Sequence, residues 1–95
     1  METKNLLKVD EKICKKYKPG VEVKHATYGK YNDLRIIWFE DNTSIAIEVN
    51  NGDNNLFDRH MKQMYQEINF SGVIVITQRI KDNNKLITFF ELKEE

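Results

Sequence analysis

Two acidic residues, Asp33 and Glu48, stand where carboxylates are able to hold a metal ion. Asp33 opens the apolar run LRIIWF, and Glu48 lies fifteen positions later, near the end of the run TSIAIEV. Adjacent strands would bring the two side chains together. Carboxylate oxygens bind divalent cations such as Mg²⁺ or Mn²⁺, and such ions polarise phosphate esters and activate water. The spacing therefore predicts a metal site made by Asp33, Glu48 and the backbone carbonyl of Val49.

The surrounding residues predict the strands that would position this pair. Residues 33–39 and 44–50 alternate in the manner of strands, and residues 40–43 have the composition of a tight hairpin between them. Because side chains alternate along a strand, Glu48 and Asn50 are expected on the same face. A further strand is predicted from Val21, over VEVKHA.

Helical spacing predicts two helices. Leu6, Val9, Ile13 and Tyr17 indicate a helix from about residue 4 to 17, which stops before the Pro-Gly pair at 19–20. A second helix is indicated by an apolar stripe made of Phe57, Met61, Met64 and Ile68.

Two more strands complete the predicted fold. Residues 73–77, VIVIT, lack alternation, which predicts a strand buried on both faces and parallel to residues 43–49 through a right-handed crossover. Residues 85–92, KLITFFEL, follow a turn at 82–84 and are expected at the sheet edge. The predicted fold is α/β, a mixed β-sheet with helices packed on it in the order αβββαββ.

Length and composition bound what the chain is able to do. Its 95 residues predict one domain, residues 1–95, and its 15 basic and 15 acidic side chains cancel. Lysines are nevertheless concentrated in the first third, where they form either a solvated face or a contact with phosphates. A single cysteine excludes an intramolecular disulfide. With no signal peptide or membrane-length apolar run, the expected location is cytoplasmic, with no membrane partner.

The order of these features resembles the core of the PD-(D/E)XK nucleases, which is shared by restriction endonucleases, Holliday-junction resolvases and small phage nucleases. The stretch IEVNNGDNNLFDRHM is similar to a segment of the Bam and Bgl type restriction enzymes. The resemblance implies a restriction-endonuclease-like fold and a Mg²⁺-dependent or Mn²⁺-dependent endonuclease that cuts DNA. A domain this small would cut two strands most simply as a homodimer.

The resemblance also implies roles for individual residues. Asp33 and Glu48 would be the catalytic metal ligands, and Asn50 stands where relatives commonly have Lys. Lys62 would then supply the missing positive charge. Nucleic-acid contacts are expected from the predicted helices, at Lys12, Lys16, Arg59 and Gln63. In an alternative alignment Glu48 takes the second acidic position and Ala46 the first, which leaves a damaged metal site.

Two other interpretations stay open at this point. The chain could be a catalytically silent nuclease-fold module that binds nucleic acid or a protein, as Asn50 in place of Lys would suit. It could also be an unrelated small α/β interaction protein, with Asp33 starting a strand and Glu48 forming a salt bridge to Arg35 on the neighbouring strand.

Overall fold

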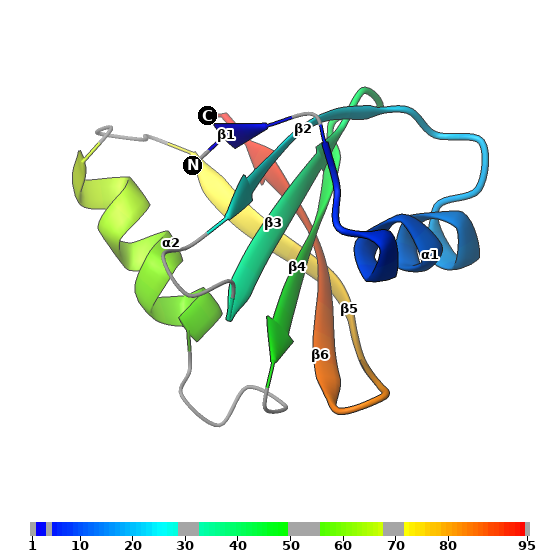
Figure 1. The fold of residues 1–95 in the computed structure, drawn as a ribbon. Coiled ribbons are helices and arrows are strands. Elements are labelled where there is room, and N and C mark those ends of the chain that lie inside the picture. The colour runs from blue at the N-terminus through cyan, green and yellow to red at the C-terminus, as the bar shows by residue number, and fades with distance from the viewer. Residues whose placement is uncertain (1, 4, 29–32, 50–55, 68–71, 95) are drawn as a thin grey trace.

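The computed structural model describes residues 2–3, 5–28, 33–49, 56–67 and 72–94, and the side chains of all of these except 2–3 and 63–67. Its elements are β1 (Glu2–Thr3), α1 (Lys8–Tyr17), β2 (Val23–Tyr28), β3 (Leu34–Phe39), β4 (Thr43–Val49), α2 (Leu56–Glu67), β5 (Val73–Asp82) and β6 (Lys85–Lys93). The strands form one six-stranded sheet in the order β1-β2-β3-β4-β6-β5. One helix covers each face, so the fold is α/β (Figure 1).

Every strand pair in the sheet is antiparallel, so the prediction of a mixed sheet with a parallel crossover is wrong. β6 lies between β4 and β5 and pairs with both. The cause is the turn after β5, where Asn83 and Asn84 both have positive φ, 49° and 63°. A two-residue turn of this kind matches strand twist and sends the chain straight back beside the strand it left.

This placement also exchanges the two predicted strand environments. β5, expected to be buried on both faces, is the edge strand, and its Val73 and Ile76 are 46% and 44% exposed. β6, expected at the edge, is interior, and Ile87 and Phe90 are at most 1% exposed. A short apolar run without alternation does not by itself tell a doubly covered strand from an exposed edge.

The hairpin between β3 and β4 is confirmed. Asn42 has φ of 67°, and the backbone N–H of Thr43 donates to Asp41 Oδ1 at 3.0 Å. The Asn side chain tolerates this left-handed conformation better than most residues do. β3 and β4 are thereby fixed in one register, which decides the face on which each side chain lies.

Each face of the sheet has its own hydrophobic core. The α1 face, which packs on α1, is built from alternate strand residues such as Ile37, Ile45 and Ile47. The α2 face, which packs on α2, holds the other set, Leu34, Ile36, Ala46 and Phe90, together with Phe57 and Met61 of the helix. Burial of Phe57 and Met61 confirms the predicted stripe of the second helix as far as its side chains are described. None of the helices in the described ranges is long and apolar enough to span a membrane.

Candidate functional site

The structure does not bring Asp33 and Glu48 together. Glu48 lies opposite Leu34 in the β3–β4 ladder, and the backbone N–H of Val49 donates to the carbonyl of Asp33 at 3.0 Å. Residues directly opposite in an antiparallel pair share a face, and neighbours along a strand alternate. Glu48 therefore points to the α2 face with Leu34. Asp33, the residue before Leu34, is expected to point to the α1 face.

A one-residue difference in register separates this arrangement from the predicted metal site. Two carboxylates on opposite faces are unable to ligate one cation with Val49 between them. Across the residues that the structure describes, no group of three or more His, Cys, Asp or Glu side chains is arranged to hold a metal.

Glu48, on β4, is instead a buried carboxylate that lies against the first residues of α2. Its side chain is 2% exposed. Burial raises the pKa of Glu48, and the backbone N–H groups of Phe57 and Leu56 partly oppose this effect. Negative charge is favoured at a helix N-terminus, because the first N–H groups have no partner within the helix. Within the described part of the chain, Glu48 Oε2 and the buried Thr88 Oγ1 have no hydrogen-bond partner.

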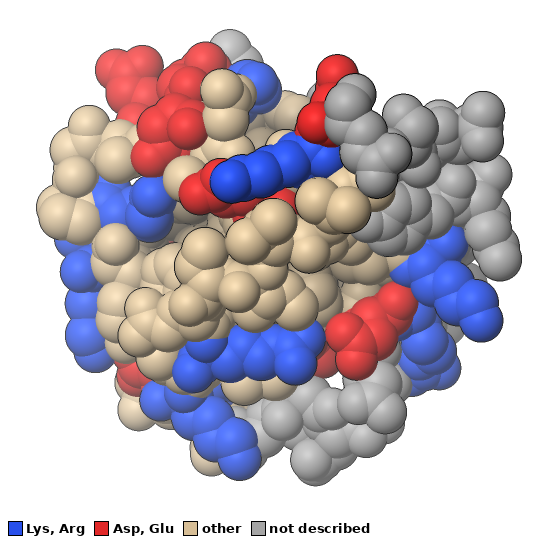
Figure 2. Space-filling model, turned by 180° about the vertical axis from the view of Figure 1, so that it is seen from behind, with Lys and Arg blue, Asp and Glu red and all other residues tan. Residues whose placement is uncertain are grey.

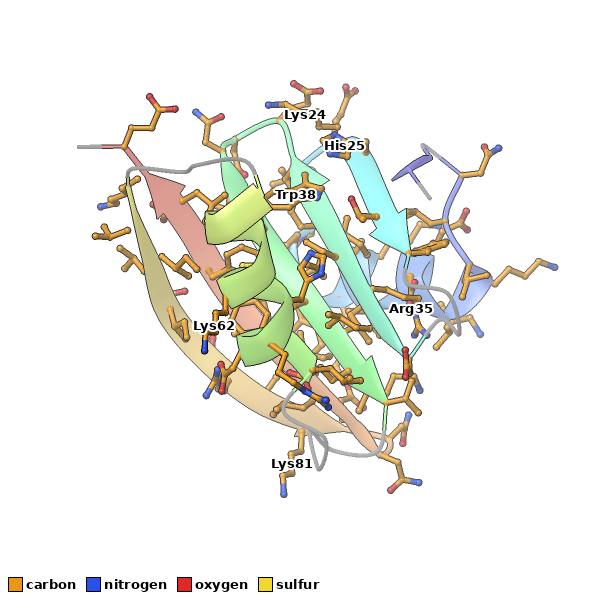
Figure 3. The ribbon with its side chains drawn as sticks, turned by 90° about the vertical axis from the view of Figure 1, so that its left-hand side faces the viewer. Lys24, His25, Arg35, Trp38, Lys62 and Lys81 are labelled. Atoms are coloured by element: carbon orange, nitrogen blue, oxygen red, sulfur yellow. The ribbon has the colours of Figure 1, made fainter. Side chains whose placement is uncertain are left out.

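The predicted salt bridge between Glu48 and Arg35 is wrong for the same reason of register. Arg35 lies opposite Ile47 and points to the α1 face. Its Nε donates to Asp10 Oδ2 at 2.7 Å and its terminal nitrogen to Asp10 Oδ1 at 3.0 Å. Figure 3 shows Arg35 at the start of β3, on the side away from α2. The guanidinium therefore links β3 to α1, a structural role that sequence spacing did not indicate.

The remaining predicted residues are spread over α2 and the segment before it. Lys62 is exposed and lies on the side of α2 that looks toward β5, with Arg35 on the other side in the same view (Figure 3). Arg59 is also exposed on α2. Asn50 and the side chain of Gln63 lie outside the described residues.

Lys12 and Lys16 line a groove between α1 and the β5–β6 turn. We call it the lysine groove; its volume is about 170 Å³, and it is bordered by Val9, Lys12, Ile13, Lys16, Asp82, Asn83 and Lys85. Three ammonium groups thus share the groove with one carboxylate. Val9 and Ile13 give it an apolar wall. The lysine-rich helix predicted from the sequence includes Lys12 and Lys16, but nothing in the sequence indicates Lys85, because only the tertiary fold brings the turn beside the helix.

Asp82 attaches the turn to the helix. Its Oδ2 accepts a hydrogen bond from Tyr17 Oη at 2.6 Å and forms an ion pair with Lys16 Nζ at 3.0 Å. The Tyr17 hydroxyl and then the Lys16 ammonium lower the pKa of Asp82, so the carboxylate stays charged at neutral pH. Lys16 is thereby engaged by the protein, whereas Lys12 has no ion-pair partner among the described residues. Lys12 and Lys85 are the ammonium groups best placed to meet an anion.

A stripe of exposed lysines extends from the groove along α1. Lys8, Lys12, Lys15 and Lys16 are all exposed and are spaced by four, three and one residues. Residues three and four apart lie on one side of a helix. The spacing was visible in the sequence, but its connection to the turn was not.

No family model matches the chain, and neither the curated proteins nor the solved structures give a significant match. The restriction-endonuclease-like class stays a prediction from order and spacing.

Proposed function

We propose that this chain is a non-catalytic module that binds nucleic acid through the phosphate backbone, using the lysine groove and the lysine stripe of α1. Its strongest support is the convergence of lysines from two segments far apart in sequence, Lys12 and Lys16 on α1 and Lys85 at the start of β6. Lysine contacts with phosphates supply most of the affinity of sequence-independent nucleic-acid binding.

The dimensions of the stripe suit a phosphate backbone. From Lys8 to Lys16 the helix rises by about 12 Å. Duplex DNA carries one negative charge per roughly 1.7 Å of its axis, so a stripe of this length faces several phosphates. The groove has no arginine, the residue that forms planar two-point contacts with base edges, so binding independent of base sequence is expected.

Catalysis is left out of the proposal because of the carboxylate geometry. The predicted endonuclease depends on Asp33 and Glu48 sharing one cation. Asp33 precedes β3 and lies opposite Val49, so alternation along the strands is expected to turn its side chain to the face away from Glu48. Lys62, the predicted substitute for the missing family lysine, lies on α2 and outside the lysine groove.

The test is a titration of labelled duplex DNA, single-stranded DNA and RNA, followed by fluorescence anisotropy over a range of salt concentrations. The key variants are Lys12→Glu and Lys85→Glu, and the matched control is Lys24→Glu. Lys24 is exposed on β2. Lys81 lies next to the β5–β6 turn that borders the groove, and Lys24 is at the opposite end of the molecule from Lys81 (Figure 3). All three changes alter the net charge equally, so only the position differs.

We expect binding to weaken steeply with salt, because each neutralised phosphate releases counterions. Each groove variant should lower affinity by about tenfold or more and reduce the slope of log affinity against log salt by about one. Lys24→Glu should leave that slope unchanged.

Three results would contradict the proposal. Equal losses in groove and control variants would indicate a general charge effect, and groove-dependent binding of polyglutamate but of no nucleic acid would indicate an acidic protein partner. Mg²⁺-dependent cleavage of DNA that Asp33→Asn and Glu48→Gln each abolish would restore the predicted nuclease.

A further inference from the structure

The edge strand β5 presents an unusual surface for the rim of a sheet. It is ten residues long, and it is the last strand in the order, so no described strand pairs with its outer side. An edge strand exposes a row of unpaired backbone N–H and C=O groups, which are a template for another strand. The opposite edge, β1, has only two residues.

The first half of β5 lacks two of the features that usually block such pairing. Residues 73–77, VIVIT, contain no charge and no proline, whereas Arg79, Lys81 and Asp82 fill the second half. Val73 and Ile76 are two of the four large apolar side chains that are exposed in the described residues. Figure 2 views the molecule from behind, the side on which β5 forms the sheet edge, and shows uncharged surface at the centre with charged side chains around it.

A bulge divides the apolar half from the charged half. The β5–β6 register shifts between Ile76 and Gln78, so Thr77 is the extra residue. A bulge bends a strand and interrupts regular pairing. The segment of β5 suited to pairing on its outer side is therefore the uncharged one that ends at Thr77.

From this pattern we infer that β5 pairs with β5 of a second copy of this chain, antiparallel and centred on Val75, so that two sheets become one. In this register Ile74 lies opposite Ile76 of the other copy, and Val73 lies opposite Thr77. The apolar half meets itself, and Arg79 and Lys81 of both copies fall outside the pairing. Cross-strand contacts between β-branched residues are favourable, and like charges placed opposite each other are not.

Other arrangements of two copies are less suitable. An antiparallel register centred on Gln78 would set Lys81 against Val75, and a parallel in-register pair would stack Arg79 on Arg79. The charge pattern of β5 thus selects a single self-complementary register. A closed twofold contact of this kind uses the same surface on both subunits and removes both exposed edges.

The pairing also has a consequence for the lysine groove, which rests on the proposed function. In an antiparallel pair of identical strands the twofold axis is perpendicular to the sheet, so both α1 helices lie on the same face of the joined sheet. Two lysine grooves would then face one nucleic acid. The dimer is inferred from β5 alone and is tested without nucleic acid, so its failure and the failure of the proposed function are distinguishable.

The experiment is sedimentation equilibrium of the full chain from micromolar to millimolar concentration, with the variants Ile76→Lys, Ile76→Glu and the milder Ile76→Thr. The matched control is Leu7→Lys, the same kind of change at another exposed apolar position, 38% exposed before α1. Circular dichroism checks that each variant is folded.

We expect a monomer–dimer equilibrium in the parent chain and in Leu7→Lys. Ile76→Lys and Ile76→Glu should each weaken it by about tenfold or more, because a charge then lies opposite the apolar Ile74 and diagonally across the axis from the same charge of the other copy. Ile76→Thr adds no charge and should weaken it less. An equimolar mixture of the Lys and Glu variants should recover dimer. A parent chain that is monomeric throughout, or a dimer that tolerates Ile76→Lys as well as Leu7→Lys, would overturn the inference.

Discussion

Among the described residues, each face of the sheet buries one carboxylate, and the surroundings of the two groups are very different. Asp10, on α1, is 0% exposed and is held at two points by Arg35. Glu48, on β4, is 2% exposed, and its Oε2 has no partner in the described structure. Burial alone therefore does not mark a functional carboxylate. The partner of the carboxylate decides whether its charge is stabilised.

The difference follows from alternation along β3. Leu34 and Arg35 are neighbours, so they point to opposite faces, and Glu48 meets the leucine. A shift of one residue would have placed the guanidinium beside Glu48 and left Asp10 unpaired. In a sheet covered on both faces, such a shift exchanges every contact of the strand.

The largest expected effect on stability comes from breaking the ion pair between Asp10 and Arg35. Asp10→Ala removes the carboxylate that holds the buried guanidinium of Arg35 at two points. We expect a loss of about 3–5 kcal/mol in the free energy of unfolding, since an uncompensated buried charge is strongly destabilising. Urea denaturation followed by circular dichroism measures it.

The exposed neighbour Glu11 provides the control. Glu11→Ala should change stability by no more than about 0.5 kcal/mol. The double variant Asp10→Leu with Arg35→Met should recover much of the loss, because two apolar side chains of similar size need no partner. A small effect of Asp10→Ala would mean that water reaches Arg35 and that the pair contributes little.

Glu48 is expected to have a smaller effect on stability, and this effect depends on pH. Burial raises the pKa of Glu48, so the folded chain holds this proton more tightly than the unfolded chain does. Its contribution to stability is complete in acid, below the ordinary glutamate pKa, and is lost as pH rises through the folded pKa. Glu48→Gln removes the ionisation and keeps an oxygen to accept from α2. The variant should therefore be more stable than the parent at neutral pH, by up to about 1–3 kcal/mol.

Denaturation at several pH values tests this directly. The advantage of Glu48→Gln should shrink as pH falls through the raised pKa of Glu48, and it should be smallest below the ordinary glutamate pKa of about 4.3. Asp58→Asn is the control, because Asp58 is an exposed carboxylate in the same first turn of α2 and its effect should be a few tenths of a kcal/mol. A stability gain that does not change with pH would show that ionisation of Glu48 is not its cause.

The sequence was informative where a local period decides the structure. The β3–β4 hairpin and the burial of Phe57 and Met61 follow from turn chemistry and helical spacing. The parallel crossover failed because a two-asparagine turn returned β6 beside β5, which a pattern of apolar residues does not reveal. Strand identity was therefore easier to predict than strand neighbours.

The candidate site was harder to predict because it depends on contacts between distant segments. Asp33 lies just before β3 and Glu48 lies near the end of β4, but only the register determines on which face of the sheet each side chain is expected. Lys12 and Lys16 were recognised from helical spacing, and Lys85 was not, since its place beside α1 is set by Asp82 in the folded chain. A sequence period tells which residues share a face, and the fold tells which faces meet.

The smallest expected effect on stability concerns Thr88, the second buried group on the α2 face that has no hydrogen-bond partner in the described structure. Thr88 is 0% exposed, its hydroxyl has no partner among the described residues, and it lies on the α2 face two pairs along the β4–β6 ladder from Glu48. Thr88→Val removes the hydroxyl at nearly constant shape, so we expect a gain of about 1 kcal/mol or less in the parent chain. Thr43→Val is the control and should lose a similar amount, because the Thr43 hydroxyl bonds Asp41.

A double-mutant cycle then tests whether the two orphan groups belong together. Glu48→Gln introduces an amide donor on the same face of the sheet as the Thr88 hydroxyl, and in that background we expect Thr88→Val to cost stability instead of adding it. A coupling of at least about 0.5 kcal/mol is expected for neighbours that interact. Strict additivity would show that Thr88 and Glu48 are buried independently, and the α2 face would then hold two separate unpaired groups, in contrast to the single paired unit under α1.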